Sequence, residues 1–163
     1  MKYIIEQMIS EALHQTNRNN KNHISFLGKV GKHNCGTIGR NSETSLHRST
    51  IPLHAEMDCI KKLAYQMSKT RTRRCDVDLI SIKVKQNGTL GNSQPCYHCA
   101  TELYKHKKIN VRHVYFSMEN GMIQKCNFND WYEETTHYVS SGWNKKLQER
   151  QNKNKNKKIK IRK

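Results

Sequence analysis

The sequence predicts a three-layer α/β/α domain, in which a sheet is covered by helices. Stretches whose apolar residues recur at helical spacing alternate with short runs rich in Val and Ile. Their order along the chain is helix, two strands, helix, strand, helix and two strands, which is typical of an α/β fold. The 163 residues are enough for one domain with a substantial core.

The N-terminal half is predicted to hold two helices and a hairpin. The predicted elements are a helix over 2–16, strands over 23–30 and 35–40, and a helix over 54–67. Pro52 introduces the second helix, which has one apolar face. Residues 42–51 consist mostly of Ser, Thr, His and Arg, in proportions that favour a loop.

The C-terminal half is predicted to continue the sheet. The predicted elements are a strand over 77–84, a helix from Pro95 to about Lys107, a strand over 111–117 and a strand over 122–128. The turn at Glu119-Asn120-Gly121 predicts that the last strand returns antiparallel. Residues 131–143 read as irregular, with their aromatic residues partly packed.

The charge divides the chain into a domain, residues 1–143, and a tail, residues 144–163, which is predicted to be disordered. The net charge is +17, of which residues 145–163 carry +9. This basicity indicates a polyanionic partner such as nucleic acid or a nucleotide phosphate, with a merely solubilising tail as the alternative. The basic connector 68–76 contains four Lys or Arg residues, and its alternative interpretation is a solvated loop.

The chain contains six cysteines, so the compartment decides what they can do. No stretch resembles a signal peptide or approaches the roughly 20 apolar residues of a membrane span. We therefore expect an intracellular, cytoplasmic protein without membrane contact. In such a compartment a Cys-x-x-Cys motif indicates metal binding or redox chemistry instead of a structural disulfide.

Two motifs carry chemistry: His54-Ala55-Glu56, and Cys96-x-x-Cys99 directly after Pro95. Together they form the H-x-E…P-C-x-x-C signature of zinc-dependent nucleobase deaminases. Each half is weak alone. Both open a predicted helix behind a strand, and this combination makes the signal specific.

The residue types suit the removal of an exocyclic amine from a base. Zinc lowers the pKa of bound water to about 7, which makes hydroxide available for attack on the ring carbon C4. His54, Cys96 and Cys99 can supply three zinc ligands and leave a fourth position open. Glu56 is then free to carry the proton from the water to the ring nitrogen and the leaving amine.

Other interpretations of these residues remain open. A structural zinc site could be completed by His98, Cys126 or another ligand, and the pattern could arise by chance from core cysteines. The remaining cysteines are expected to be small buried or half-buried residues; they are Cys35, Cys59, Cys75 and Cys126. The histidines outside the motif show no pattern and are expected at the surface or in packing.

The stretches Leu53–Asp58 and Ser93–Ala100 resemble the cytidine/deoxycytidylate deaminase superfamily. The resemblance covers about residues 1–128. It implies a five-stranded mixed sheet between helices, zinc on His54, Cys96 and Cys99, and Glu56 as the proton shuttle. It also implies that the chain forms a homo-oligomer, as superfamily members often do.

A weaker similarity concerns the substrate. Asn41-Ser42-Glu43 resembles the Asn-x-Glu with which cytidine deaminases hold the ribose, and turn or cap chemistry is the alternative for both residues. The resemblance also implies contacts from the backbone amides of Ala55 and Cys96 to the base. Asp58 departs from the pattern, because many deoxycytidylate deaminases have Asn there.

These observations predict a nucleotide-binding hydrolase of pyrimidine metabolism that converts cytosine to uracil in a free nucleoside or nucleotide. The alternatives are a polynucleotide deaminase that binds RNA or single-stranded DNA through the basic tail, and a non-catalytic, zinc-stabilised binding module. The phosphorylation state, the sugar, the oligomeric state and the choice of cytosine over adenine are left open by the sequence.

Overall fold

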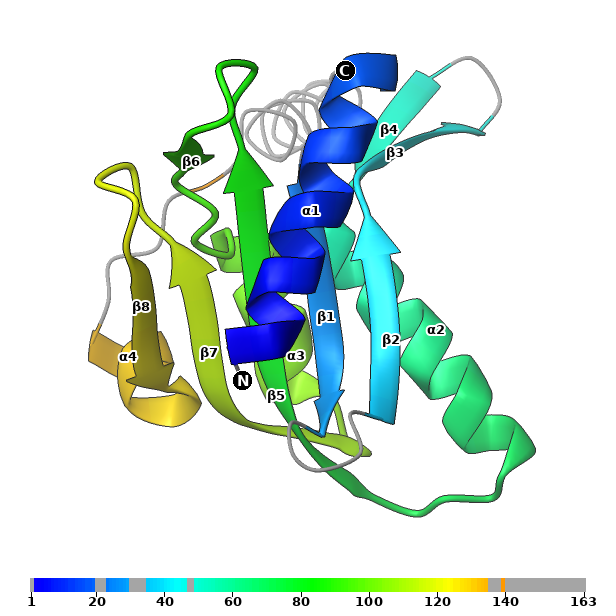
Figure 1. Cartoon of the computed structure of the whole chain (residues 1–163). Coiled ribbons are helices and arrows are strands. Elements are labelled where there is room, and N and C mark those ends of the chain that lie inside the picture. The colour runs from blue at the N-terminus through cyan, green and yellow to red at the C-terminus, as the bar shows by residue number, and fades with distance from the viewer. Residues whose placement is uncertain (1, 20–22, 30–34, 47–48, 135–138, 140–163) are drawn as a thin grey trace, which may run out of the picture.

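The computed structural model describes residues 2–19, 23–29, 35–46, 49–134 and 139 (Figure 1). Its helices are α1 Lys2–Asn19, α2 Ala55–Lys69, α3 Tyr97–Lys105 and α4 Phe128–Glu134. Its strands are β1 His23–Lys29, β2 Cys35–Arg40, β3 Ser42–Leu46, β4 Ser49–Leu53, β5 Cys75–Val84, β6 Leu90–Gly91, β7 Ile109–Ser117 and β8 Ile123–Asn127. Residues 31–34, the predicted turn between the strands predicted over 23–30 and 35–40, lie outside the described residues. The predicted tail at 144–163 lies outside them too.

A mixed sheet forms the centre of the domain, as the sequence predicted. The strands run in the order β2-β1-β5-β7-β8, and the short β6 pairs with the end of β5. Only β5 and β7 are parallel within this described sheet. Helix α3 connects them (Figure 1). This β5-α3-β7 unit brings the start of α3 to the same edge of the sheet as the start of α2.

Helices cover both faces of the sheet, which confirms the three-layer prediction (Figure 1). On one face α1 buries Ile4, Met8 and Ala12 against the side chains of Ile24 and Ile82. On the other face α2, α3 and α4 share the larger core with alternate residues of the same strands. The alternation follows from the two-residue period of a strand, whose successive side chains point to opposite faces.

Two segments differ from the sequence-based expectation. Residues 42–51, expected to be a loop, contribute to an antiparallel hairpin of β3 and β4 in which Ser42 pairs with Leu53. Such a polar stretch lacks the apolar alternation that identifies a strand. The start of the stretch expected to be irregular is helical, because Trp131 belongs to α4. Its ring packs 6.2 Å from that of Phe116, and this tertiary contact is invisible to periodicity.

Among the described residues, no helix is both long enough and apolar enough to cross a membrane.

Candidate metal centre

Three predicted ligands meet where two helices begin. His54 is the N-cap residue of α2 and Cys96 is the N-cap residue of α3, with Cys99 one turn further on. The His54 Nδ1 atom lies 3.3 Å from the Sγ of Cys96 and 3.3 Å from the Sγ of Cys99. The two sulfurs are 3.6 Å apart. The fold thus joins residues separated by more than forty positions in the chain.

These distances fit zinc. Around a tetrahedral zinc with Zn–S of about 2.3 Å and Zn–N of about 2.0–2.1 Å, two sulfurs lie about 3.8 Å apart and a sulfur and a nitrogen about 3.6 Å apart. The observed separations are only a few tenths of an ångström shorter. Within the part of the chain that the structure describes, no further His, Cys, Asp or Glu joins this group of three. Three ligands with an open fourth position are typical of a catalytic zinc site and not of a structural one.

The electrostatics of the centre favour a cation. The hydrogen bond between the side chains of Cys96 and Cys99, more than any other contact, lowers the pKa of Cys96 to about 3. The same hydrogen bond raises the pKa of Cys99 well above its usual value, and burial adds to the effect. The hydrogen bond with Cys96 raises the pKa of His54. A divalent cation bound here would take both sulfurs as thiolates and displace their protons.

Glu56 lies beside the ligands without being one of them. Its side chain is 1 % exposed, at the first turn of α2. Its Oε2 atom is 3.7 Å from the Sγ of Cys99, which donates to it. Its Oε1 atom faces the sheet. A buried carboxylate next to an open metal position is suitably placed to carry protons.

The sheet holds the other oxygen of Glu56 through Ser81. A carboxylate only accepts, so the Ser81 hydroxyl donates to Glu56 Oε1, at 3.3 Å. The lone pairs of the Ser81 hydroxyl oxygen can then accept hydrogen bonds from His23 Nε2, at 2.7 Å, and from the Ser25 hydroxyl, at 3.0 Å. This assignment places a proton on His23 Nε2. Burial is the main cause that lowers the pKa of His23, which agrees with a neutral ring.

Neither His23 nor Ser81 was predicted as part of the site. His23 was expected at the surface or in packing; its side chain is 15 % exposed, and its Nε2 atom lies 3.6 Å from Glu56 Oε1. The pairing of Ser25 with Ser81 across β1 and β5 brings these residues together. A lone His or Ser in a strand carries no motif, so only the register of the sheet could have identified them.

A cavity of about 150 Å³ opens onto the centre. Its lining consists of His23, Asn41, His54, Glu56, Lys83, Asn92, Ser93, Gln94 and Cys96. The Asn41 side chain accepts a hydrogen bond from the backbone N–H of Ala55, at 2.8 Å, and so caps the start of α2. Asn41 therefore lines the cavity and shows the cap chemistry named as its alternative role, and its sugar contact stays a prediction. The side chain of Glu43 lies outside the described residues.

Serine side chains fix the loop that delivers Cys96. The hydroxyl of Ser93 donates to the carbonyl of Ser81, at 2.6 Å, and the hydroxyl of Ser117 donates to the carbonyl of Gly91, at 2.6 Å. Both hydroxyls are buried. They tie the loop to the ends of β5 and β7, so that Pro95 and Cys96 follow in a defined position.

The comparisons with known proteins found deaminases among the solved structures. A dCMP deaminase from the cyanophage S-TIM5 matches with a TM-score of 0.47 and 18 % identity over 85 % of this chain and 97 % of its own. A cytidine deaminase from Mycobacterium leprae matches with a TM-score of 0.38 and 20 % identity over 74 % of this chain and 91 % of its own. No family model and no curated protein matches the sequence.

The chain resembles the cytidine/deoxycytidylate deaminase superfamily in its two motifs, His54-x-Glu56 and Pro95-Cys96-x-x-Cys99. It has the mixed sheet between helices that the motifs implied. The chemistry assigned to the centre rests on its own side chains, and not on these two structural similarities.

Proposed function

We propose that this chain is a zinc-dependent hydrolytic deaminase that converts cytosine to uracil in a free nucleoside or nucleotide. The observation that carries the proposal is the arrangement of Glu56 and the three donors. His54, Cys96 and Cys99 lie at the spacing of a tetrahedral metal site with an open position. Glu56 is buried beside them and is not needed as a ligand. A purely structural metal site has no use for that carboxylate.

The reaction adds water to C4 of the base, breaks the bond from C4 to the exocyclic nitrogen and releases ammonia. Zinc, when bound by His54, Cys96 and Cys99, supplies the nucleophile by lowering the pKa of water to about 7. Glu56 takes one proton from the attacking water and delivers it to the ring nitrogen, and it then carries the second proton of that water to the departing amine. Ser81 fixes the direction of the carboxylate through its hydrogen bond to Oε1.

The rim of the cavity supports a sugar-bearing substrate. Asn41 uses its Oδ1 atom to cap α2, which leaves its amide NH2 as a donor for a sugar hydroxyl. The cavity of about 150 Å³ is smaller than the roughly 300–1,000 Å³ of drug-sized sites, so it suits the base, with the sugar at its mouth. We extend the proposal to Glu43 as a second sugar contact.

A substrate panel tests this function. Zinc-loaded protein is incubated with cytosine, cytidine, deoxycytidine, their monophosphates, adenosine and a cytosine-containing oligonucleotide, and ammonia is measured. We expect turnover of at least one free cytosine nucleoside or nucleotide. Turnover of adenosine alone would contradict the choice of base, and turnover of the oligonucleotide alone would favour the polynucleotide alternative.

Lys83 can reveal whether the preferred substrate carries a phosphate. It is an exposed cation at the rim of the same cavity. If the substrate is a monophosphate, Lys83→Gln should raise its KM about tenfold, because a charge-assisted hydrogen bond contributes about 1.5–3 kcal/mol. KM for the nucleoside should not change. An equal effect on both substrates would show that Lys83 does not bind the phosphate.

A further inference from the structure

Seven cations gather at the end of the molecule away from the candidate metal centre. They come from the ends of α2 and α3 and from the connectors that follow these helices. We call this region the basic cleft; its cations are Lys69, Arg71, Arg73, Arg74, Lys105, Lys107 and Lys108, and all are exposed. The two connectors are joined, since the N–H of Cys75 donates to the carbonyl of Lys108 at 2.9 Å.

The charges of the basic cleft are not neutralised within the described structure, where none of the seven forms an ion pair. Glu102, which lines a hollow beside three of the lysines, contributes one negative charge to this region. Cations in the last turn of a helix are often explained by the helix dipole. That explanation covers Lys69 and Lys105, which lie in last turns. It does not cover the five cations beyond the helix ends.

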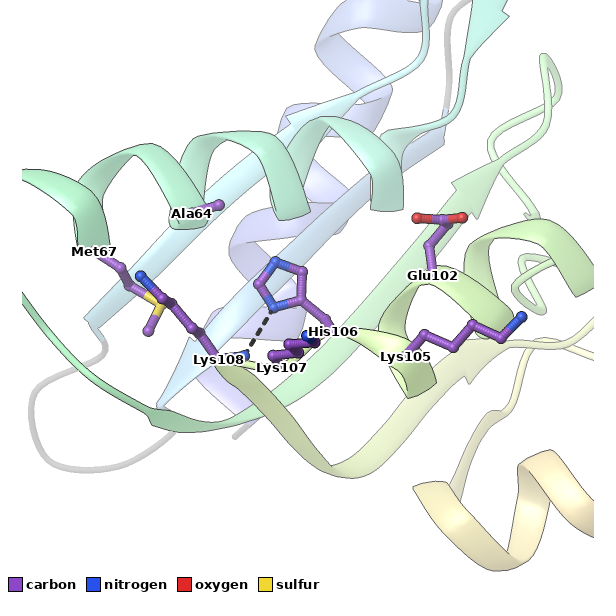
Figure 2. Close-up of a pocket in the computed structure, with 7 residues that line it drawn as sticks. All are labelled: Ala64, Met67, Glu102, Lys105, His106, Lys107 and Lys108. Atoms are coloured by element: carbon purple, nitrogen blue, oxygen red, sulfur yellow. Dashed lines mark hydrogen bonds between the residues drawn. The ribbon is translucent and has the colours of Figure 1, made fainter.

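This hollow of about 410 Å³, lined by the three lysines Lys105, Lys107 and Lys108 of the cleft, lies between α2 and the start of β7 (Figure 2). Figure 2 shows the ring of His106 pointing from its connector toward α2. The Nδ1 atom of His106 accepts the backbone N–H groups of Ile109, at 3.0 Å, and Lys108, at 3.3 Å. Nε2 therefore carries the ring proton and offers the hollow a neutral donor beside the lysines.

Arg71 gives an independent indication of function. Its φ is 53°, the left-handed conformation that usually belongs to Gly or Asn just after a helix. A residue with a Cβ pays about 1 kcal/mol there relative to Gly. The chain thus keeps a guanidinium where backbone energetics favour Gly. Such strain is typical of positions whose side chain has a task.

The accompanying side chains favour a strand of nucleic acid over a lipid surface. Tyr65, on α2, is 62 % exposed, and the Lys69 ammonium lies 4.6 Å from its ring centroid. Cations beside an exposed aromatic ring are typical of single-strand binding, where bases stack and phosphates pair with charges. Among the described residues, no large aliphatic side chain of this region is exposed that could enter a membrane.

We propose that the basic cleft binds the phosphates of single-stranded nucleic acid. Ala64 and Met67, which line the hollow, follow Glu56 by 8 and 11 residues, so the hollow lies about 12–17 Å from Glu56 along the axis of α2. The cleft is therefore a site separate from the cavity of the metal centre. Its binding does not depend on the proposed deaminase activity.

The first test compares two triple variants of the full chain that lose the same charge. Lys105→Gln/Lys107→Gln/Lys108→Gln removes lysines of the cleft. The matched control is Lys2→Gln/Lys85→Gln/Lys125→Gln, whose residues lie on α1, after β5 and on β8. Both leave the basic tail unchanged. Affinity for a fluorescein-labelled 20-mer of dT is measured against salt concentration.

The cleft variant should weaken binding several-fold and reduce the salt slope by about 0.7 for each lost phosphate contact, up to about 2. The control should change both much less. Equal effects of the two variants on affinity would overturn the proposal. A cleft variant that loses affinity only for duplex DNA or for anionic phosphatidylglycerol vesicles, and keeps its affinity for the 20-mer, would also overturn it. Glu56→Gln should bind like the wild type, so a failure of the deaminase proposal leaves this result intact.

Arg71 provides the second test, which separates binding from folding. Arg71→Gly removes the charge and relieves the backbone, so the urea midpoint should stay the same or rise while affinity for the 20-mer falls. Arg71→Lys keeps the charge and should retain most of the binding. Unchanged affinity in Arg71→Gly would contradict a role for this residue.

Discussion

The contacts that hold Glu56 come from the sheet and from α3. Ser81 on β5 donates to one carboxylate oxygen and Cys99 on α3 approaches the other. Because both partners are buried, the carboxylate has a fixed direction before substrate arrives. At this scale the essential point is orientation, since the same carboxylate turned away from the open metal position could not carry a proton.

Ser81→Ala removes the hydroxyl between Glu56 and His23. We expect kcat to fall about tenfold or more, because a hydrogen bond to a charged group contributes about 1.5–3 kcal/mol. Zinc content should stay unchanged, since Ser81 contacts no ligand in the described hydrogen bonds. The matched control is Ser25→Ala, which removes a hydroxyl that contacts Ser81 but not Glu56. Equal losses in the two variants would show that Ser81 has no special role.

The buried His23 should make folding stability depend on pH. Burial lowers its pKa in the folded chain below the usual 6.5. The unfolded chain therefore binds more protons below about pH 6.5, so this residue contributes a loss of stability as the pH falls through that value. In His23→Gln the loss between pH 7.5 and 5 should be smaller. The urea midpoints of the wild type and of His23→Gln at several pH values measure how much stability His23 costs at low pH, because the two proteins share all other titratable groups.

At the scale of elements, the centre depends on how closely α2 approaches β2. Gly39 makes this approach possible, because a Cβ placed there would lie 2.1 Å from the carbonyl oxygen of Ala55 and 2.7 Å from the backbone nitrogen of Cys59. Both are backbone atoms and cannot rotate away. The first turn of α2, which follows the ligand His54, is thus positioned by a missing side chain.

Gly39→Ala should displace the start of α2. We expect a loss of about 1–3 kcal/mol in the free energy of unfolding, as for other overpacked sites, and weaker zinc binding. Denaturant unfolding and competition with a zinc chelator measure the two effects. Gly91→Ala is the control, since a Cβ there would meet only flexible lysine carbons at 3.4 Å. Wild-type zinc affinity in Gly39→Ala would contradict this account of the close approach.

Long elements were predictable from the sequence and short ones were not. Residues 2–16 and 54–67 carry enough apolar repeats to identify α1 and α2 within a few residues. The hairpin of β3 and β4 has no such repeat. Helix α4 has seven residues, and its aromatic residues are ordered by stacking, such as that of Tyr132 on Tyr104 at 4.3 Å. Such contacts join distant parts of the chain and leave no local pattern.

At the scale of the whole molecule, the two sites lie at opposite ends of α2 and α3. The helix starts bring together His54, Cys96 and Cys99, and the helix ends bring together the basic cleft. The candidate metal ligands could be named from the sequence because the spacing of the motif indicates their chemistry. Of the two segments that form the basic cleft, the sequence analysis identified only the basic connector 68–76. The other segment, residues 105–108, joins it through the parallel pairing of β5 and β7.

The central claim is that Glu56 carries the proton at an open metal site. The most direct test compares ammonia release from cytosine nucleosides and nucleotides by wild type and Glu56→Gln at equal zinc content. The variant keeps the shape of the side chain but cannot accept a proton. We predict zinc-dependent turnover by the wild type and a loss of at least 100-fold in the variant, in line with general acid–base catalysis. Equal rates in the two zinc-loaded proteins, or no turnover by either, would contradict the claim.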